Sequence, residues 1–242
     1  MSRRDEDGHL AMSNFWDQYP TDRLMAEASL WSADFTRFRE EILRVDPFAD
    51  LYHIDVADDH FVPGLLFFPD LVASLRPLTK KAFHVHLMAD NPLGLIDEFA
   101  GAGANLITVQ AELGPLAPTA LQKIHTLGLG AGLALGLDVP VELVLPYLEM
   151  LDIVVLMGTP LGVKGAEPSH LSYARMRAMQ SMLQKQGFSE QVKIEADGGI
   201  REHTVPTLRA SGADLIVMGS LAFKSRDLDE TFTWVHRLPK DK

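Results

Sequence analysis

Residues 53–63 read His-Ile-Asp-Val-Ala-Asp-Asp-His-Phe-Val-Pro, and the rest of the chain is best interpreted from this stretch. Side chains on a β-strand alternate between its two faces, so a strand here places His53 and Asp55 on one face and Ile54 and Val56 on the other. Strands of a covered parallel sheet are normally apolar throughout, because a buried imidazole or carboxylate without a partner is costly to desolvate. The pair is therefore either a hydrogen-bonded core pair or part of a ligand set.

Two further strand-like runs end in the same kinds of side chain. Residues 83–88 alternate His84 and His86 with apolar residues, and residues 192–199 reach Asp197 and then two glycines. Three strands that each deliver a possible ligand near their carboxyl ends favour a metal site over coincidence. Imidazoles and carboxylates without a thiolate suit one catalytic divalent ion, with Zn, Fe, Mn and Co all open.

Short apolar runs alternate with amphipathic segments along the whole chain, with no linker between them. The expected strands are 24–31, 51–56, 82–88, 105–109, 131–135, 152–157, 192–196 and 214–218, and the expected helices include 35–45, 118–127, 139–149, 169–186, 201–211 and 227–238. Successive right-handed βα units in that number close into a (β/α)8 barrel, or TIM barrel, which a chain of 242 residues can form as a single α/β domain. A doubly wound open sheet is the alternative, but no Gly-x-Gly-x-x-Gly fingerprint follows an early strand.

We assign residues 23–242 to the barrel domain and residues 1–22 to a short N-terminal extension. The extension carries Phe15, Trp16 and Tyr19, which could pack against the barrel or against a second subunit. The apolar loop at 61–68 would also suit a subunit contact, and we expect a homo-oligomer.

Composition excludes several classes of partner. The net charge of −11 leaves no basic stripe for nucleic acid or an anionic membrane. The chain has no cysteine, hence neither disulfides nor thiolate-bound zinc. No stretch approaches the roughly 20 apolar residues of a membrane span, and the first residues lack the apolar core of a signal peptide. We therefore expect a cytoplasmic protein that acts on a small molecule.

Glycine-containing turns follow the last two expected strands, Gly198-Gly199 after one and Gly219-Ser220 after the other. A single such turn indicates only a tight bend, but two on neighbouring strands predict a cradle of backbone N–H groups where barrels commonly hold phosphate. Lys164, in the loop 158–168, could add a cation, although a solvated surface position is the more common environment for a lysine.

With these features in place, residues 53–63 resemble the signature of the ribulose-phosphate 3-epimerase family, which includes allulose-6-phosphate 3-epimerases. Other motifs occur in the same order as in that family. Residues 29–34 resemble its first-strand motif, residues 85–88 its third and residues 194–199 its seventh. The similarity extends over about residues 24–238.

The resemblance implies a metal-dependent enzyme that inverts C3 of a phosphorylated ketose, ribulose 5-phosphate or a relative. Positions that match the family's metal ligands are His53, Asp55, His86 and Asp197, and the two aspartates also match its acid and base. Inversion removes a proton from one face of a carbon and returns one to the other, so it requires two groups, and the metal would stabilise the enediolate between the steps. Ser29 matches a first-strand serine near the substrate, and Met88 and Met157 match methionines that line the metal pocket. The positions that match phosphate contacts are Gly198, Gly199, Gly219 and Ser220.

Several positions depart from the family pattern while the metal and acid–base set is retained. Asp59, Gly64, Ala57 and Gln110 stand where the family usually has glycine, asparagine, methionine and histidine. The sixth loop, residues 159–166, is shorter than the usual glycine-rich run. These changes alter the expected wall of the pocket and leave open which ketose phosphate binds.

Two other functions stay open at this stage. An aldose–ketose isomerase would use the same enediolate chemistry but needs only one base, so a requirement for both aspartates separates the two enzymes. A barrel that binds a sugar phosphate and a metal without catalysis would need neither carboxylate as an acid or base.

Overall fold

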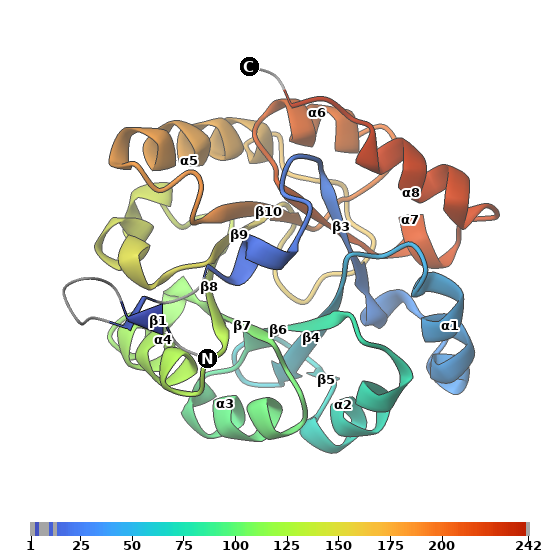
Figure 1. The fold of residues 1–242 in the computed structure, drawn as a ribbon, viewed down its shortest axis with the longest axis horizontal. Helices are drawn as coiled ribbons and strands as arrows, with labels where there is room; N and C mark the ends of the chain where they lie inside the picture. The colour runs from blue at the N-terminus through green and yellow to red at the C-terminus, as the bar shows by residue number, and fades with distance from the viewer. Residues whose placement is uncertain (1–2, 5–9, 12–13, 241–242) are drawn as a thin grey trace.

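A closed ring of eight parallel strands surrounded by helices forms the body of the protein in the computed structural model, which describes residues 3–4, 10–11 and 14–240 (Figure 1). In ring order the strands are β3 (Met25–Ser29), β4 (Leu51–Asp58), β6 (Ala82–Met88), β7 (Leu106–Gln110), β8 (Gly130–Leu135), β9 (Ile153–Met157), β10 (Lys193–Asp197) and β11 (Leu215–Met218). Strand β11 pairs with β3 and β3 with β4, which closes the ring. The predicted (β/α)8 barrel is confirmed, and the open doubly wound sheet is excluded.

The remaining elements connect or flank the ring. The α-helices are α1 (Phe38–Val45), α2 (Pro69–Leu75), α3 (Pro92–Gly101), α4 (Leu116–Thr126), α5 (Ser172–Gln186), α6 (Val205–Ala210), α7 (Ser220–Phe223) and α8 (Leu228–His236). The 3-10 helices are η1 (Phe15–Gln18), η2 (Leu30–Ser32), η3 (Phe35–Arg37), η4 (Arg76–Leu78), η5 (Ala111–Leu113) and η6 (Val141–Met150). Short antiparallel pairings add β1 (Arg3–Arg4) with β2 (Leu10–Ala11), and β5 (Leu65–Leu66) with the end of β4.

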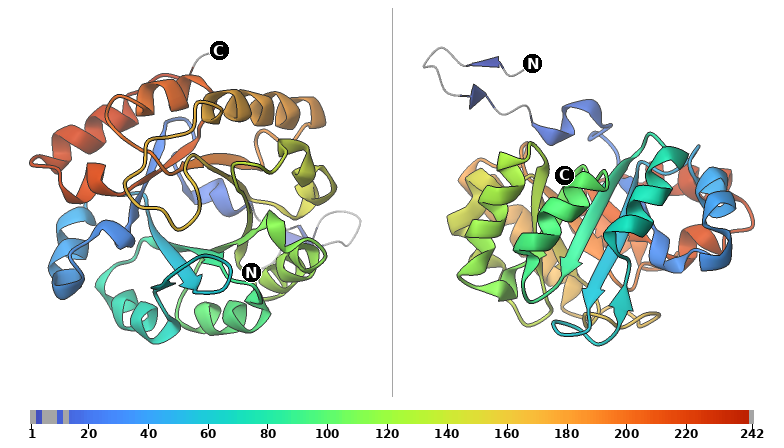
Figure 2. Two further views of the ribbon diagram at one scale, coloured as in Figure 1. Left: turned by 180° about the vertical axis from the view of Figure 1, so that it is seen from behind. Right: turned by 90° about the horizontal axis from the view of Figure 1, so that it is seen from below.

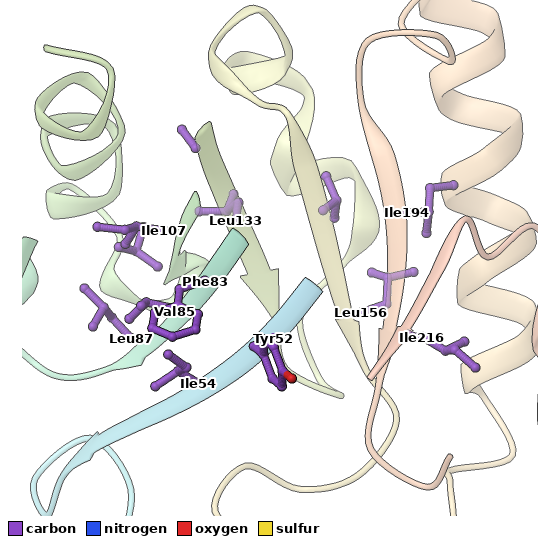
Figure 3. Packing of buried hydrophobic residues seen from close by; sticks show 14 of the residues in the cluster. Tyr52, Ile54, Phe83, Val85, Leu87, Ile107, Leu133, Leu156, Ile194 and Ile216 are labelled. Carbon is purple, nitrogen blue, oxygen red and sulfur yellow. The ribbon is translucent and has the colours of Figure 1, made fainter. Parts of the chain in front are cut away.

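Alternation along the strands separates an apolar outer face from a partly polar inner face. Tyr52 and Ile54 of β4 point outward into the core between strands and helices, as do Phe83 and Val85 of β6 (Figure 3). This outer core is continuous around the ring and contributes most of the burial. The intervening residues of the same strands face the inside of the barrel, where the functional side chains gather.

Three elements differ from those expected from the sequence. The segment predicted as a helix at 139–149 is the 3-10 helix η6, with Pro146 inside it, because proline lacks the N–H that an α-helix needs and crowds the preceding turn. Strand β3 ends at Ser29, where the chain turns into η2, so the prediction that it reaches residue 31 was too long. The four-residue helix α7 was not predicted.

The amino-terminal segment closes one end of the barrel. Trp16, on η1, is 2% exposed and packs with Met25, Leu51 and Leu106, which point inward at the starts of their strands. Its indole Nε1 donates a hydrogen bond of 2.6 Å to the carbonyl oxygen of Asp152. We call this end of the barrel, with Trp16 at its centre, the floor. In Figure 2 (right) η1 lies on one side of the barrel and the loop after β9 on the opposite side.

In the part of the chain that the structure describes, no helix is both long and apolar enough to cross a membrane.

Candidate metal centre and substrate cavity

Four side chains predicted to bind a metal converge inside the carboxyl end of the barrel. His53 and Asp55 come from β4, His86 from β6 and Asp197 from β10, and one ligand atom of each lies within 4.8 Å of the others. His53 Nε2 is 3.4 Å from Asp55 Oδ1 and 3.8 Å from Asp197 Oδ2. His86 Nδ1 lies 3.8 Å and 3.7 Å from the same two oxygens.

The residues present fit a bound divalent ion. His53 Nε2 and His86 Nδ1 are buried and have no hydrogen-bond partner among the described residues, although both face the two carboxylates. A buried nitrogen without a partner is costly, and a cation between the imidazoles and carboxylates would satisfy all four groups. Two nitrogen and two oxygen donors suit a borderline divalent ion, as the sequence predicts, and do not select one metal.

The charges at this centre are strongly coupled. Burial alone lowers the pKa of His53, but the nearby Asp55 carboxylate outweighs it and raises that pKa well above the usual histidine value. His86 is similar: burial lowers its pKa, and the nearby carboxylates of Asp197 and Asp55 raise it above the usual value. Burial raises the pKa of Asp55, but the interaction with His53 outweighs burial and holds that pKa far below the normal range. Protons and a bound metal ion would therefore compete for the same nitrogens.

A cavity of about 400 Å³ opens from the two aspartates toward solvent. Ser29, Met88 and Met157, all predicted contacts, line it, and the Ser29 hydroxyl donates a hydrogen bond of 3.1 Å to Asp55 Oδ2. Gly198, Gly199, Gly219 and Ser220 line it as well. All the predicted site residues except His53 and His86 thus line one cavity, and ligand atoms of these two histidines lie within 4.8 Å of those of the two aspartates.

Glycines let the loops after β9 and β10 touch at the cavity wall. Gly198 and Gly199 have φ values of 93° and 71°, in the left-handed region that favours glycine. A Cβ on Gly199 would collide with the ring and nitrogen of Pro168, and one on Gly158 would collide with the backbone of Gly198. The Gly158 N–H donates to the Asp197 carbonyl at 2.5 Å, which ties the sixth loop to the end of β10.

Three cationic side chains line the same cavity, and sequence reasoning identified one of them. Lys164 reaches back over the opening, where its Nζ donates to the carbonyl oxygen of Trp31 at 2.5 Å. Arg201 and Lys224, together with Trp31 and Ser32, were not predicted to lie there. The signal for them was available, because Arg201 follows the Gly198-Gly199 turn and Lys224 follows Gly219-Ser220 by four residues.

Comparison with known proteins adds an independent line of evidence. The model of the ribulose-phosphate 3 epimerase family matches residues 25–223. The chain belongs to this family. The ribulose-phosphate 3-epimerase of Bacillus subtilis is 36% identical over 200 residues, covering 82% of this chain and 92% of that protein. That of Rhodobacter capsulatus is 37% identical over 197 residues, covering 81% and 84%.

More distant solved structures share the fold. The 3-hexulose-6-phosphate synthase of Salmonella typhimurium superposes with a TM-score of 0.64 at 15% identity, covering 89% of this chain and 98% of that one. Orotidine 5'-phosphate decarboxylase of Pyrococcus horikoshii gives 0.63 at 15% identity, covering 88% and 97%. At this level of identity the likeness supports the barrel architecture alone.

The departures from the epimerase family pattern fall into two groups in space. The sixth loop lines the cavity through Thr159, Pro160 and Gly162, so it does change the pocket wall. Asp59 and Gly64 are exposed and close the turn after β4, where the Gly64 N–H donates to the Asp59 carboxylate at 2.7 Å.

Gln110 also lies away from the wall. It is fully buried behind His86, so its predicted effect on the pocket is indirect.

Asp58 fixes the signature loop through hydrogen bonds to three backbone N–H groups. Its Oδ1 accepts from the backbone N–H groups of His60 at 2.9 Å and Phe61 at 2.8 Å, and its Oδ2 accepts from Asp90 at 2.9 Å. Within the described residues, Asp58 and His60 are not part of the cavity lining.

A second polar layer lies directly below the metal centre in this epimerase barrel. Glu27, His84 and Glu195 are fully buried, and the register pairs His53 with His84 and Asp55 with His86. His84 therefore lies deeper in the barrel than His86. Glu27 was missed, although an acidic residue within the otherwise apolar run 24–28 was a visible signal.

Proposed function

We propose that this protein inverts C3 of a phosphorylated ketose, ribulose 5-phosphate or a related ketose phosphate, with Asp55 and Asp197 as the acid and base. As a member of the ribulose-phosphate 3 epimerase family, the chain is a carbohydrate-phosphate epimerase, an enzyme of the isomerase class. The observation that carries the finer proposal is that both carboxylates line one cavity from different sides of the ring.

The placement of the two aspartates matches the demands of inversion. Strands β4 and β10 are separated by β3 and β11 on one side of the ring and by four strands on the other. A carbon held between them would present one face to each carboxylate, so one group can remove the proton while the other returns one. An aldose–ketose isomerase needs only a single base on one face of the substrate. Two carboxylates on different sides of the ring therefore favour an epimerase over an isomerase.

The surroundings hold Asp55 in the ionised form that a base requires. Burial raises the pKa of Asp55, but His53 lowers it by more and holds it far below the normal range. Asp55 is therefore a carboxylate before the substrate reacts. The Ser29 hydroxyl fixes one of its oxygens. His53, Asp55, His86 and Asp197 would hold the divalent ion, which supplies Lewis-acid stabilisation of the negative charge that develops on the sugar oxygens.

A phosphate group is supported by the opposite part of the cavity. Gly198, Gly199, Gly219 and Ser220 offer backbone and hydroxyl donors there, and Arg201 and Lys224 add positive charge. The chain as a whole has a net charge of −11, yet three cationic side chains line this cavity. This local positive charge favours an anionic substrate.

Proton NMR in D2O tests the reaction directly. The protein is loaded in turn with Zn²⁺, Mn²⁺, Co²⁺ and Fe²⁺ and incubated with ketose phosphates of four to six carbons. We expect one sugar to form its C3 epimer and to gain solvent deuterium at C3. Asp55→Asn and Asp197→Asn should each lower the rate of inversion by about 10²- to 10⁴-fold. Metal content is measured in parallel, so that loss of the ion is distinguished from loss of proton transfer.

The other outcomes discriminate between functions. Deuterium at C1 with formation of an aldose phosphate would replace the epimerase with an isomerase. Absence of exchange at every carbon of every sugar, in protein that holds a metal and binds sugar phosphate, would support a non-catalytic binding barrel.

A further inference from the structure

The two ligand histidines are each held from behind by a buried side chain. His53 Nδ1, the ring nitrogen that faces away from the metal centre, lies 3.0 Å from Glu27 Oε2. The same carboxylate oxygen lies 2.9 Å from His84 Nδ1, and His84 Nε2 lies 2.7 Å from the Thr108 hydroxyl. Glu27, His53 and His84 are fully buried.

His86 presents the opposite ring nitrogen to the metal centre. Its Nδ1 faces the aspartates, and its Nε2 lies 2.6 Å from the side-chain amide nitrogen of Gln110. A half-turn of that amide exchanges its nitrogen and oxygen, so the group can present either a donor or an acceptor to the ring. The amide oxygen of Gln110 is buried and has no other partner among the described residues.

We propose that Glu27 and Gln110 are positioning residues that impose opposite tautomers on the two metal-binding histidines. A neutral imidazole that offers one nitrogen to a metal carries its proton on the other. His53 offers Nε2, so its Nδ1–H donates to the Glu27 carboxylate. His86 offers Nδ1, so its Nε2–H donates to the Gln110 amide oxygen. The inference rests on the proposed metal centre but not on the identity of the sugar.

The two supports differ in charge, which gives them different consequences. A carboxylate behind an imidazole increases the basicity of the nitrogen that faces the metal, while a neutral amide mainly fixes the orientation of the ring. Glu27 should therefore contribute more to metal affinity than Gln110. His84 affects His53 indirectly, because the Nδ1 atoms of both rings lie within hydrogen-bond distance of the same oxygen of Glu27.

A competing account is that the second polar layer holds a metal ion of its own. Ligand atoms of Glu27, His53, His84 and Glu195 also lie within 4.8 Å of one another, and the free oxygens of both glutamates have no partner among the described residues. His53 would then have to lose both ring protons and bridge two ions. The tautomer account requires no such deprotonation and uses each ring nitrogen once.

Metal binding by the full chain tests the assignment without any substrate. Zn²⁺ affinity is measured by competition with a chelator, and metal content by elemental analysis. We expect one Zn²⁺ per chain, bound about 10- to 100-fold more weakly by Glu27→Gln than by the wild type. Gln110→Glu serves as the matched exchange, because it adds to His86 the charge that the first variant removes from His53. It should bind Zn²⁺ at least as tightly as the wild type.

The second measurement needs no variant and stays informative if a substitution prevents folding. In ¹H–¹⁵N spectra of the Zn²⁺-loaded wild type, we expect the retained ring proton on Nδ1 of His53 and on Nε2 of His86. Two Zn²⁺ ions per chain, a His53 ring without a proton, or unchanged affinity in Glu27→Gln would each overturn the proposal. None of these results depends on epimerase activity, so failure here is separate from failure of the proposed reaction.

Discussion

The two ends of the barrel are built from the same eight strands but from different kinds of side chain. At the floor, the inward residues at the strand starts are apolar, among them Met25, Leu51 and Leu106, and Trp16 covers them. At the carboxyl ends, the inward residues are Ser29, His53, Asp55, His86 and Asp197. Burial of apolar surface stabilises a fold, whereas buried ionisable groups cost stability unless they are paired. The floor therefore offsets the energetic cost of the metal centre.

This division predicts that substitutions at the two ends have separable effects. Changes at the floor should alter stability and leave turnover per folded molecule intact. Changes at the cavity should do the reverse. Three predictions test the division, taken from the largest expected effect to the smallest.

Trp16→Ala should be the most damaging substitution at the floor. It removes a buried aromatic side chain and its hydrogen bond to the carbonyl of Asp152, and Trp-to-Ala changes in cores cost about 3–5 kcal/mol. For a domain of this size we expect the melting temperature to fall by about 10 °C in thermal unfolding.

Trp16→Phe is the matched control, because it keeps an aromatic ring in the floor and loses mainly the N–H donor. Its melting temperature should lie between those of Trp16→Ala and the wild type. If Trp16→Ala instead lowered kcat in fully folded protein, the two ends would not be independent.

Arg201→Ala and Lys224→Ala should weaken substrate binding at the cavity. Each removes a cation that lines the part of the cavity proposed to hold phosphate, and a partly exposed charge-assisted contact corresponds to about a tenfold change in affinity. We expect KM to rise about tenfold, with a smaller change in kcat and little change in melting temperature.

Arg226→Ala is the control, since Arg226 is exposed and close in sequence to Lys224 but does not line the cavity. Weaker inhibition by inorganic phosphate in the two cavity variants would link the effect to the anion. Equal KM values in all three variants would argue that the cations do not contact substrate.

Asp50→Asn should have the smallest effect, and that effect should depend on pH. Asp50 lies at the rim of the floor, where it accepts hydrogen bonds from Arg23, the Ala26 N–H and His236. Burial raises the pKa of Asp50, but His236 and Arg23 outweigh it and lower the pKa below the usual aspartate value.

Because the folded-state pKa is lowered, this carboxylate stabilises the fold above the unfolded-state pKa of about 3.9. That stabilisation is lost as pH falls through the folded-state value. We expect Asp50→Asn to cost about 1 kcal/mol at pH 7 and to lose less stability than the wild type on acidification below pH 4. Parallel pH profiles in urea denaturation would contradict this.

The sequence predicted the strands of the barrel well because their patterns are local. Strand β6 has the limits expected for residues 82–88, since its apolar outer face alternates with two imidazoles. The convergence of His53, Asp55, His86 and Asp197 was also predictable, because parallel strands bring their carboxyl ends to one place whatever the details of packing. The resemblance to the epimerase family supplied the roles of those residues, which the pattern alone left open.

What the sequence did not predict depends on contacts across the barrel. Glu27 and His84 meet His53 only because β3, β4 and β6 are neighbours in a fixed register. Likewise, Arg201 and Lys224 face the cavity through the paths of two loops, which no periodicity describes. The prediction of an α-helix at 139–149 was wrong for a local reason, because Pro146 lies inside this segment and cannot donate a helical hydrogen bond.

The aromatic floor has a consequence for how far the amino-terminal segment can be shortened. Met12 and Met25 lie on either side of Trp16 in the sequence. A chain started at Met12 would keep Trp16 and hence a closed barrel. A chain started at Met25 would still contain every ligand and acid–base residue, yet it would expose the apolar starts of its strands to water. A shortened gene product of the second kind should accumulate in inclusion bodies even though its catalytic residues are complete.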